Sequence, residues 1–222
     1  NELQKIINLK SFYWRKAPVN ENVGRVFYDT HIWGEKFITE KLAGLNYNIA
    51  FGEFFQNNVP LTEKMIQYVI DNIDQKDNAP ILDLYCGVGT FTLPIAQNNK
   101  GTVTGVEIVQ SAINSAQINA QNNHITNITF KCADVKTIIT NILTRTTFRT
   151  IVVDPPRAGL GEYVTQGLIQ SKAHRLIYIS CNAKTMAKDL RKLQQAYTIE
   201  KLQLFDMFPQ TAHIETLVEL VI

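Results

Sequence analysis

Residues Ile81–Leu93 read ILDLYCGVGTFTL: a short apolar run, a glycine turn and the start of a helical segment. Gly87 and Gly89 let the backbone turn tightly and approach a ligand with no side chain in the way. Glu107 ends the next apolar run, 20 residues after Gly87. An acidic side chain there can accept the ribose hydroxyls of a nucleoside. The stretch therefore predicts a strand–turn–helix unit that binds a nucleoside.

This turn differs from the dinucleotide-binding fingerprint at residue 92. The fingerprint carries a third glycine there, and this chain has Thr92. S-Adenosylmethionine contains no pyrophosphate and does not require that glycine. The pattern thus favours S-adenosylmethionine over a nicotinamide dinucleotide. A glycine turn in an unrelated α/β protein, with Glu107 as an ordinary surface charge, remains the alternative, because glycine patterns alone are weak signals.

Downstream of this stretch the chain alternates between apolar runs and helical segments. The expected strands are Ile81–Tyr85, Thr102–Glu107, Ile128–Cys132, Thr150–Asp154 and Arg175–Cys181. One expected helix begins near Thr90, and two more span Val109–Asn122 and Val135–Leu143. Nearly continuous apolar runs suit strands that are buried on both faces. The alternation therefore predicts a doubly wound, mostly parallel α/β sheet.

The two ends of the chain depart from this alternation. Leu202–Phe208 and Ile214–Ile222 have no helix between them and predict an antiparallel hairpin at the sheet edge, typical of class I methyltransferases. Residues 1–50 are aromatic-rich and less regular, so we expect a small N-terminal appendage, with residues 51–222 as the catalytic domain. Within and after this appendage, the segments considered are a strand at Val23–Asp29, a short helix at Glu35–Leu42, a loop at Phe51–Pro60 and a helix at Leu61–Lys76.

The composition is that of an ordinary globular protein: 222 residues, 45% hydrophobic and 19% charged. No apolar run reaches the length of a membrane span, and the N-terminus has no signal pattern. A net charge of +2 neither supports nor excludes a nucleic-acid partner. The three cysteines match no metal motif, and their odd number argues against a disulfide framework. We therefore expect reduced thiols and a cytoplasmic location.

Ile151–Gly159 reads IVVDPPRAG, an apolar strand that ends in Asp154 and is followed by two prolines. Each proline fixes φ, so the loop is rigid. It follows the carboxyl end of a strand, where open α/β sheets bind ligands, and Asp154 can hold a polar group of substrate or cofactor. Enzymes that methylate exocyclic amines carry an aromatic residue where this chain has Arg157. A loop that only rigidifies the strand end remains the alternative.

Leu176–Asn182 reads LIYISCN, which puts Cys181 at the carboxyl end of another strand. A lone buried cysteine is usually a small core residue, but this one is expected at the ligand-binding edge. Carbon-5 of uracil is too weak a nucleophile to attack a methyl sulfonium at a useful rate. A thiolate that adds to carbon-6 would put electron density on carbon-5, so Cys181 is a candidate covalent nucleophile.

Such a reaction also needs a base that removes the carbon-5 proton and lets the thiol leave. Glu215 begins the last apolar run, where burial raises the pKa of a carboxyl and suits it to this role. His213 competes for the role, although we favour a structural, hydrogen-bonded histidine there.

Five motifs occur in order: FFQN (Phe54–Asn57), DLYCGVGTF (Asp83–Phe91), VVDPPRAGL (Val152–Leu160), YISCN (Tyr178–Asn182) and DMFPQTAHIE (Asp206–Glu215). Together they resemble the RNA uracil-5-methyltransferase family, whose members modify tRNA or rRNA. The resemblance implies S-adenosylmethionine as cofactor, an RNA substrate, Cys181 as nucleophile and Glu215 as base. The cofactor-binding residues expected on this basis are Gln56, Tyr85, Gly87, Gly89, Thr90, Glu107, Asp134 and Asp154. The expected substrate-binding residues are Gln56, Asp154 and Arg157.

The chain departs from the family pattern in three respects. Family members often have Asn at the position of Thr90. Many begin with an oligonucleotide-binding barrel, and some hold an iron–sulfur cluster with four cysteines, but this sequence contains neither feature. We therefore expect no iron–sulfur cluster, no other metal and no membrane partner, and either a C-terminal fragment or a reduced form.

Two other functions remain open. An exocyclic-amine methyltransferase would share the fold but would not use Cys181. A non-catalytic RNA-binding or folding module would not need the complete set of candidate residues. A basic series follows Cys181 at helical spacing, namely Lys184, Lys188, Arg191 and Lys192. It could contact phosphates, and a solvated helix face is an equally good interpretation.

Overall fold

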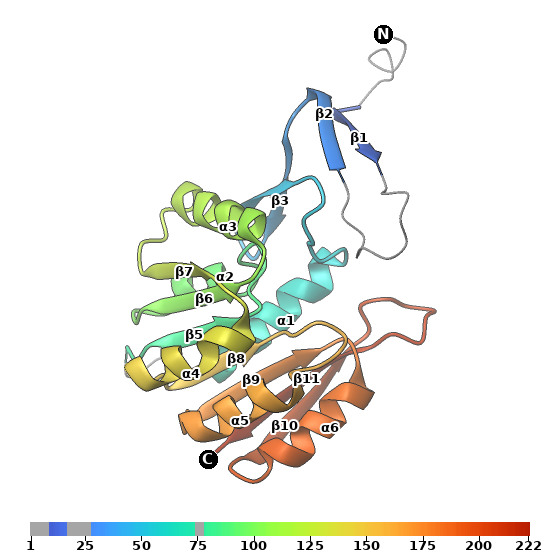
Figure 1. Ribbon diagram of the computed structural model, residues 1–222. Helices are drawn as coiled ribbons and strands as arrows, with labels where there is room; N and C mark the ends of the chain where they lie inside the picture. The colour runs from blue at the N-terminus through green and yellow to red at the C-terminus, as the bar shows by residue number, and fades with distance from the viewer. Residues whose placement is uncertain (1–8, 17–27, 74–77) are drawn as a thin grey trace.

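The computed structural model describes residues 9–16, 28–73 and 78–222 (Figure 1). Its centre is a seven-stranded sheet in the order β10-β11-β9-β8-β5-β6-β7. These strands are β5 (Ile81–Leu84), β6 (Val103–Glu107), β7 (Ile128–Cys132), β8 (Thr150–Val153), β9 (Arg175–Ser180), β10 (Thr198–Phe205) and β11 (Glu215–Val221). Strand β5 pairs with β6 and β8, β6 with β7, and β8 with β9, all in parallel. The predicted doubly wound, mostly parallel sheet is therefore confirmed.

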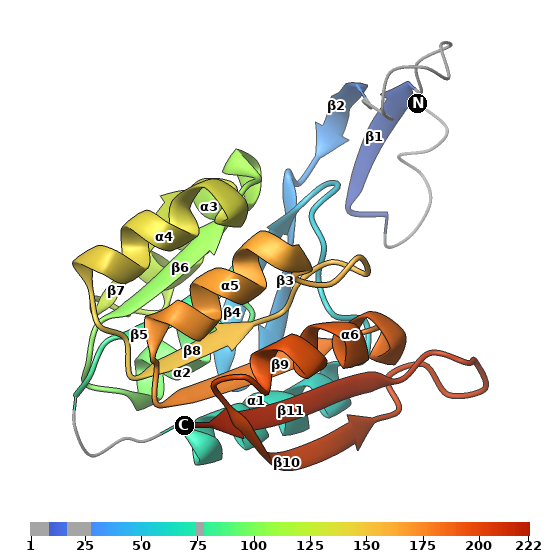
Figure 2. The ribbon, with the colours of Figure 1, turned by 60° about the horizontal axis from the view of Figure 1, so that its bottom comes forward.

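Helices cover both faces of this sheet. In the described part of the chain they are α1 (Val59–Asn72), α2 (Thr92–Asn98), α3 (Gln110–Asn122), α4 (Val135–Arg145), α5 (Gly161–Ser171) and α6 (Ala183–Leu193). Helices α4, α5 and α6 lie side by side (Figure 2) and share one buried apolar cluster, whereas α1, α2 and α3 contribute to another. In β8, Val152 faces one cluster, and Ile151 and Val153 face the other, as successive strand residues do. The sheet thus separates two apolar cores, and the loops that position the candidate site follow the ends of its strands.

The C-terminal hairpin is present at the sheet edge, as predicted. Strand β11 pairs antiparallel with both β9 and β10. Residues 215–220 of β11 are buried, whereas in β10 only Phe205 is buried. Strand β10 begins at Thr198 and ends three residues before the predicted end at Phe208. Residues 206–214 therefore form the loop that leads into β11.

Two hairpins precede the sheet: β1 (Ser11–Lys16) with β2 (Tyr28–Gly34), and β3 (Phe37–Leu42) with β4 (Leu45–Ala50). The helix considered for Glu35–Leu42 is wrong. Ala43 and Gly44 both have positive φ, 51° and 77°, which gives a tight turn between two paired strands. Residues 23–27 of the strand considered at Val23–Asp29 lie outside the described residues.

Strand β4 and helix α1 connect the hairpins to the body of the molecule. Tyr47 of β4 is fully buried in the same apolar cluster as Met65 of α1. The N–H of Asn48 donates to Oδ1 of Asn119 in α3 at 2.8 Å. Asn58 caps α1 and donates from Nδ2 to the carbonyl of Met207 at 3.2 Å. The segment before α1 is thus attached to the loop between β10 and β11.

Among the residues that the structure describes, no helix is long and apolar enough to cross a membrane. Within the same ranges, no group of three or more His, Cys, Asp or Glu side chains is arranged to hold a metal ion. The thiols of Cys86, Cys132 and Cys181 are free.

Candidate active site

The glycine loop after β5 depends on backbone conformations that few side chains allow. Gly87 and Gly89 have φ values of 53° and 89°, and Tyr85 has a φ of 66°. A Cβ on Gly89 would lie 2.2 Å from Cδ1 of the buried Leu93. The N–H of Gly89 donates to the carbonyl of Cys86 at 2.9 Å and closes the turn. The loop therefore leads directly into α2 and leaves its outer side free at Gly87, where a Cβ would meet nothing within 4 Å.

Glu107 joins this loop to the start of α3. Its Oε2 accepts the N–H of Gly87 at 3.2 Å. Its Oε1 accepts the N–H groups of Ile108 at 2.8 Å and Val109 at 2.9 Å. A carboxylate offers about four acceptor positions, so one position on Oε2 remains for a ligand hydroxyl.

Asp83 lies beneath the loop and was not among the residues that the sequence singled out. Its side chain is buried and accepts a 2.5 Å hydrogen bond from the hydroxyl of Thr92. Burial, the largest cause, raises the pKa of Asp83 to about 7; the Thr92 hydrogen bond opposes this and Glu107 adds to it. The one signal in the sequence is a carboxylate inside an apolar strand.

Among the other residues expected around a cofactor, Tyr85 and Thr90 follow β5 and Asp134 follows β7, whereas Gln56 belongs to the segment before α1. Asp134 follows β7 and caps α4 with its side chain. The carbonyl of Thr90 lies 3.4 Å from the hydroxyl of Tyr47. Burial, with Asp134 among the smaller causes, raises the pKa of Tyr85 to about 12. Gln56 is buried in the segment before α1.

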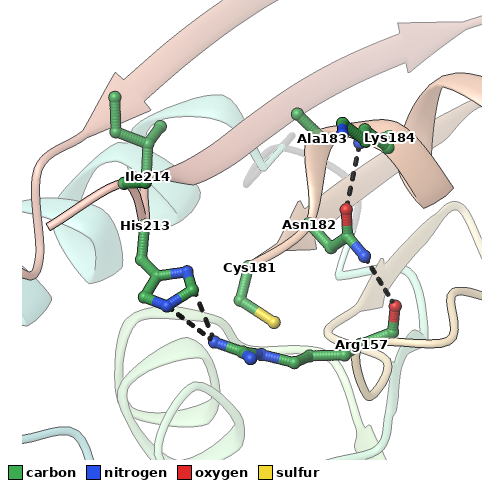
Figure 3. A pocket seen from close by; sticks show the side chains of 8 residues that line it. Arg157, Cys181, Asn182, Ala183, Lys184, His213 and Ile214 are labelled. Carbon is green, nitrogen blue, oxygen red and sulfur yellow. Dashed lines mark hydrogen bonds between the residues drawn. The ribbon is translucent and has the colours of Figure 1, made fainter.

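A second group of candidate residues surrounds a cavity of about 350 Å³ beside the loop that follows β8 (Figure 3). The lining residues are Arg157, Cys181, Asn182, Ala183, Lys184, Ala212, His213 and Ile214. Nη2 of Arg157 lies 3.4 Å from Nδ1 and 3.5 Å from Nε2 of His213. Cys181 lies beside the Arg157 side chain, and its sulfur points toward it (Figure 3).

Opposing effects act on the Cys181 thiol. Burial, followed by the negative charge of Glu215, raises its pKa. A hydrogen bond to Arg157 and the positive charge of that side chain act in the opposite direction, and Asp154 adds to the increase. The thiol therefore lies within electrostatic range of one cation and two carboxyl groups.

The two carboxyl groups differ in their surroundings. Glu215 is 7% exposed, and burial raises its pKa while Arg157 lowers it. Asp154 retains some exposed surface, yet burial of its carboxyl raises its pKa well above the usual range, with Glu215 and then Asp83 adding to the effect. Both groups thus favour the neutral form more than an exposed carboxyl does.

The structure thus brings together most of the predicted site, in two adjoining parts. The glycine loop, Glu107 and Asp134 gather at the ends of β5, β6 and β7. Cys181, Arg157, Asp154 and Glu215 interact at the ends of β8, β9 and β11. Gln56 is not among the residues that line the cavity around Cys181.

Comparison with known proteins identifies relatives. The chain matches the family model described as tRNA (uracil-5-)-methyltransferase over residues 21–221. It is 36% identical over 188 residues to an uncharacterized RNA methyltransferase of Clostridium acetobutylicum, which covers 84% of this chain and 41% of that protein. It is 36% identical over 166 residues to the 23S rRNA (uracil(1939)-C(5))-methyltransferase RlmD of Marinomonas sp., covering 74% of this chain and 37% of that protein.

A solved structure extends the similarity to three dimensions. The crystal structure of Pyrococcus abyssi tRNA (uracil-54, C5)-methyltransferase in complex with S-adenosyl-L-homocysteine superposes with a TM-score of 0.79 at 31% identity. The match covers 96% of this chain and 51% of that one. The chain spans about two fifths of the length of the two curated relatives. The family model covers nearly all of this chain, and the resemblance seen in the motifs is confirmed: the chain belongs to the tRNA (uracil-5-)-methyltransferase family.

Proposed function

We propose that this chain transfers a methyl group from S-adenosylmethionine to carbon-5 of a uridine in tRNA or rRNA, with Cys181 as nucleophile and Glu215 as base. The observation that carries the proposal is one thiol, directly after a strand, that lies beside Arg157 in a cavity shared with His213 and within electrostatic range of two carboxyl groups. With such a substrate we also propose a cytoplasmic location.

The glycine loop fits the proposed cofactor. Gly87 leaves open space above the backbone, and one acceptor position of Glu107 remains for a ribose hydroxyl. Ile108, 60% exposed, and Val109, 49% exposed, offer apolar surface beside that carboxylate for a flat ring. Tyr85, Asp134 and the other expected cofactor residues complete this part of the site. When bound, S-adenosylmethionine supplies an electrophilic methyl group.

Cys181 would act first. Its thiolate forms a bond from sulfur to carbon-6 of the uracil, and the electron pair of the carbon-5–carbon-6 double bond moves toward carbon-5 and the adjacent carbonyl oxygen. Arg157 donates to the sulfur and favours the thiolate, whereas burial and Glu215 oppose it. The cation beside the thiol therefore offsets part of the effect of burial and Glu215, which still leaves the pKa of Cys181 raised.

Glu215 would act after carbon-5 has gained its methyl group. Its carboxylate takes the carbon-5 proton, the double bond forms again, and the bond from sulfur to carbon-6 breaks to return the thiolate. A carboxyl with a raised pKa is a stronger base than an exposed one once it is ionised. His213, which also lines the cavity, is the competing candidate for this proton transfer.

The base would be recognised by polar groups at the same edge. Asp154 follows β8, and we propose that it binds the polar edge of the uracil together with Gln56. Arg157 lies close enough to Cys181 to contact the same nucleotide. The division into residues 1–50 and 51–222 belongs to the proposal too, with the first part on the substrate side.

The test is nucleotide-resolution mapping of 5-methyluridine in RNA from cells with and without the gene. We expect at least one uridine to lose its methyl group, the wild-type gene to restore it, and the Cys181→Ala gene not to restore it. An unchanged map would contradict the enzymatic function and favour a non-catalytic RNA-binding module. A lost methyl group on an exocyclic amine, restored by the Cys181→Ala gene, would favour the exocyclic-amine enzyme.

A further inference from the structure

Side chains from the N-cap and the first two turns of α6 form hydrogen bonds with the backbone of the loop that follows β8. Asn182, which caps α6, donates from Nδ2 to the carbonyl oxygen of Arg157 at 3.1 Å. Thr185 donates its hydroxyl to the same oxygen, also at 3.1 Å. The backbone of Arg157 is therefore fixed by two side chains that follow Cys181 by one and four residues in the sequence.

Asp189 holds the other end of this loop segment. Its Oδ2 accepts the N–H of Leu160 and the hydroxyl of Tyr178, both at 2.8 Å. The side chain is only 7% exposed, and Asn182, Thr185 and Asp189 recur at a spacing that puts them on one face of a helix. The carboxylate thus ties α6 to the loop and to β9 at once.

Gly159 shows how closely the loop approaches this carboxylate. It has a φ of 81°, and a Cβ there would lie 2.6 Å from Oδ2 of Asp189 and 3.3 Å from Cβ of Thr185. Only a glycine allows both this conformation and this approach. Residues 157–160 therefore pack closely against α6, with hydrogen bonds at Arg157 and at Leu160.

We infer that Asn182, Thr185 and Asp189 are positioning residues, which hold the backbone of residues 157–160 and thereby keep the Arg157 guanidinium beside the Cys181 thiol. The inference rests on the proposed function only in taking Cys181 as the nucleophile. Asp189 touches neither the thiol nor the cavity; it acts through the loop.

Several charged or titratable groups face the thiol, so the contribution of Arg157 must be separated from theirs. Glu215 comes from β11, Asp154 from the end of β8, and His213 from the loop before β11. Lys184 lines the same cavity from α6. Among these groups, Arg157 is the one whose backbone Asn182 and Thr185 hold, while Asp189 holds Leu160, three residues further along the same loop.

The experiment measures the rate of alkylation of Cys181 by iodoacetamide against pH in the whole chain, without RNA or cofactor. Mass spectrometry of the Cys181 peptide separates it from the exposed Cys132 and the buried Cys86. We expect Asp189→Ala to raise the midpoint of the profile by about one pH unit, the lower end of the effect of losing a neighbouring opposite charge. Thr185→Val should shift it in the same direction.

Three further variants decide whether Asp189 acts through Arg157. Asp189→Asn keeps an oxygen that can accept both bonds and should restore the wild-type midpoint. Tyr178→Phe removes one partner of Asp189 but not the bond to the loop, and should lower stability without moving the midpoint. In an Arg157→Ala background, Asp189→Ala should cause no additional shift.

An unchanged midpoint in folded Asp189→Ala and Thr185→Val, or an undiminished shift in the Arg157→Ala background, would overturn the inference. If Asp189→Ala does not fold, Thr185→Val, which loses a single hydroxyl, decides the question. The measurement needs no methyl transfer, so absence of 5-methyluridine activity would count against the proposed function and not against this positioning role.

Discussion

At the scale of single residues, Glu107 holds the glycine loop and the start of α3, and we propose that it also binds the cofactor. It accepts three backbone N–H groups and leaves one acceptor position free. We expect Glu107→Ala to weaken S-adenosylmethionine binding by about 1–3 kcal/mol, the scale of a lost charged hydrogen bond. Glu107→Gln, which keeps one acceptor oxygen, should lose less. Calorimetry on the folded variants measures both, and an unchanged affinity in Glu107→Ala would remove Glu107 from the cofactor site.

Cys181 and Glu215 should fail in different ways, because each is proposed to act in a different step. We expect Cys181→Ala to abolish turnover and every covalent complex with RNA. Glu215→Gln should still allow addition and methyl transfer and then accumulate an enzyme–RNA adduct that carries the new methyl group. Denaturing gels and mass spectrometry detect that adduct.

A 5-fluorouridine RNA provides the control for these two variants. It should trap the wild-type chain at the same stage, since fluorine cannot leave as a proton does. An adduct that persists in Cys181→Ala would contradict the role of the thiol. Accumulation in His213→Ala but not in Glu215→Gln would assign the base to His213.

The raised pKa of Asp83 predicts how the stability of the folded chain depends on pH. Its pKa is about 7 in the folded chain, against about 3.9 for an ordinary aspartate. The folded state therefore binds more protons between these values. The stability that the neutral carboxyl contributes is fully present below about pH 4 and is lost as the pH rises through about 7.

We expect Asp83→Asn, which stays neutral and can still accept the Thr92 hydroxyl, to be more stable than wild type at pH 8. The gain should be at most about 4 kcal/mol, from a shift of about three pH units, and should disappear towards pH 4. Denaturant unfolding at several pH values measures it. Parallel stability curves for the two proteins would show that the Asp83 carboxyl does not titrate as stated.

At the scale of elements, the glycine loop can be tested by adding one methyl group. Gly89→Ala would put a Cβ against the buried Leu93 at a φ of 89°, so we expect loss of cofactor binding by more than tenfold together with reduced stability. Gly44→Ala is the matched control: its φ is 77°, but a Cβ there meets nothing within 4 Å. It should cost about 1–2 kcal/mol of stability and leave cofactor affinity unchanged. Equal affinities in Gly89→Ala and wild type, measured by calorimetry, would contradict the close approach.

The buried strands were predictable because each is a short apolar run bounded by polar residues, and β7 has the predicted ends. Helix α5 was not predicted. Its buried apolar side chains are Val164 and Leu168, with Leu160 at the N-cap, but Gly161 and Gly167 lower its intrinsic helix propensity. Phe37–Leu42 is only six residues long, too short for the spacing of its apolar residues to distinguish a strand from a helix. The tight turn at Ala43 and Gly44 pairs this segment with β4 and makes it a strand.

The motifs also indicated most of the candidate site, since strand-end positions follow directly from where the apolar runs stop. Asp189 and Asp83 could not be found in this way. Asp189 lies in a helix that is rich in charged residues, and its contacts with Leu160, Tyr178 and Gly159 appear only in the folded chain. Such contacts between distant segments depend on packing that one sequence does not encode locally.

At the scale of the whole molecule, the proposed uracil site draws on four segments far apart in the sequence. Gln56 comes from the segment before α1, Asp154 from the end of β8, Cys181 from the end of β9 and Glu215 from the start of β11. The parallel strands bring two of these to one edge, and the antiparallel insertion of β11 beside β9 brings the last. The geometry of the proposed base-reading groups is therefore set by the fold as a whole.

This arrangement predicts selectivity for uracil over cytosine. Uracil presents an N–H donor at position 3 beside a carbonyl acceptor, whereas cytosine presents an acceptor beside an amino donor. If Asp154 and Gln56 match the first pattern, as we propose, they leave polar groups unpaired against the second, so we expect methylation of a cytidine to be slower by about 10⁴-fold. The measurement compares single-turnover rates on two RNAs that differ only in the target base, with Gln56→Ala expected to reduce the ratio. Because Cys181 could add to either ring, equal rates would show that Asp154 and Gln56 do not read the base, and would favour a cytosine or exocyclic-amine enzyme.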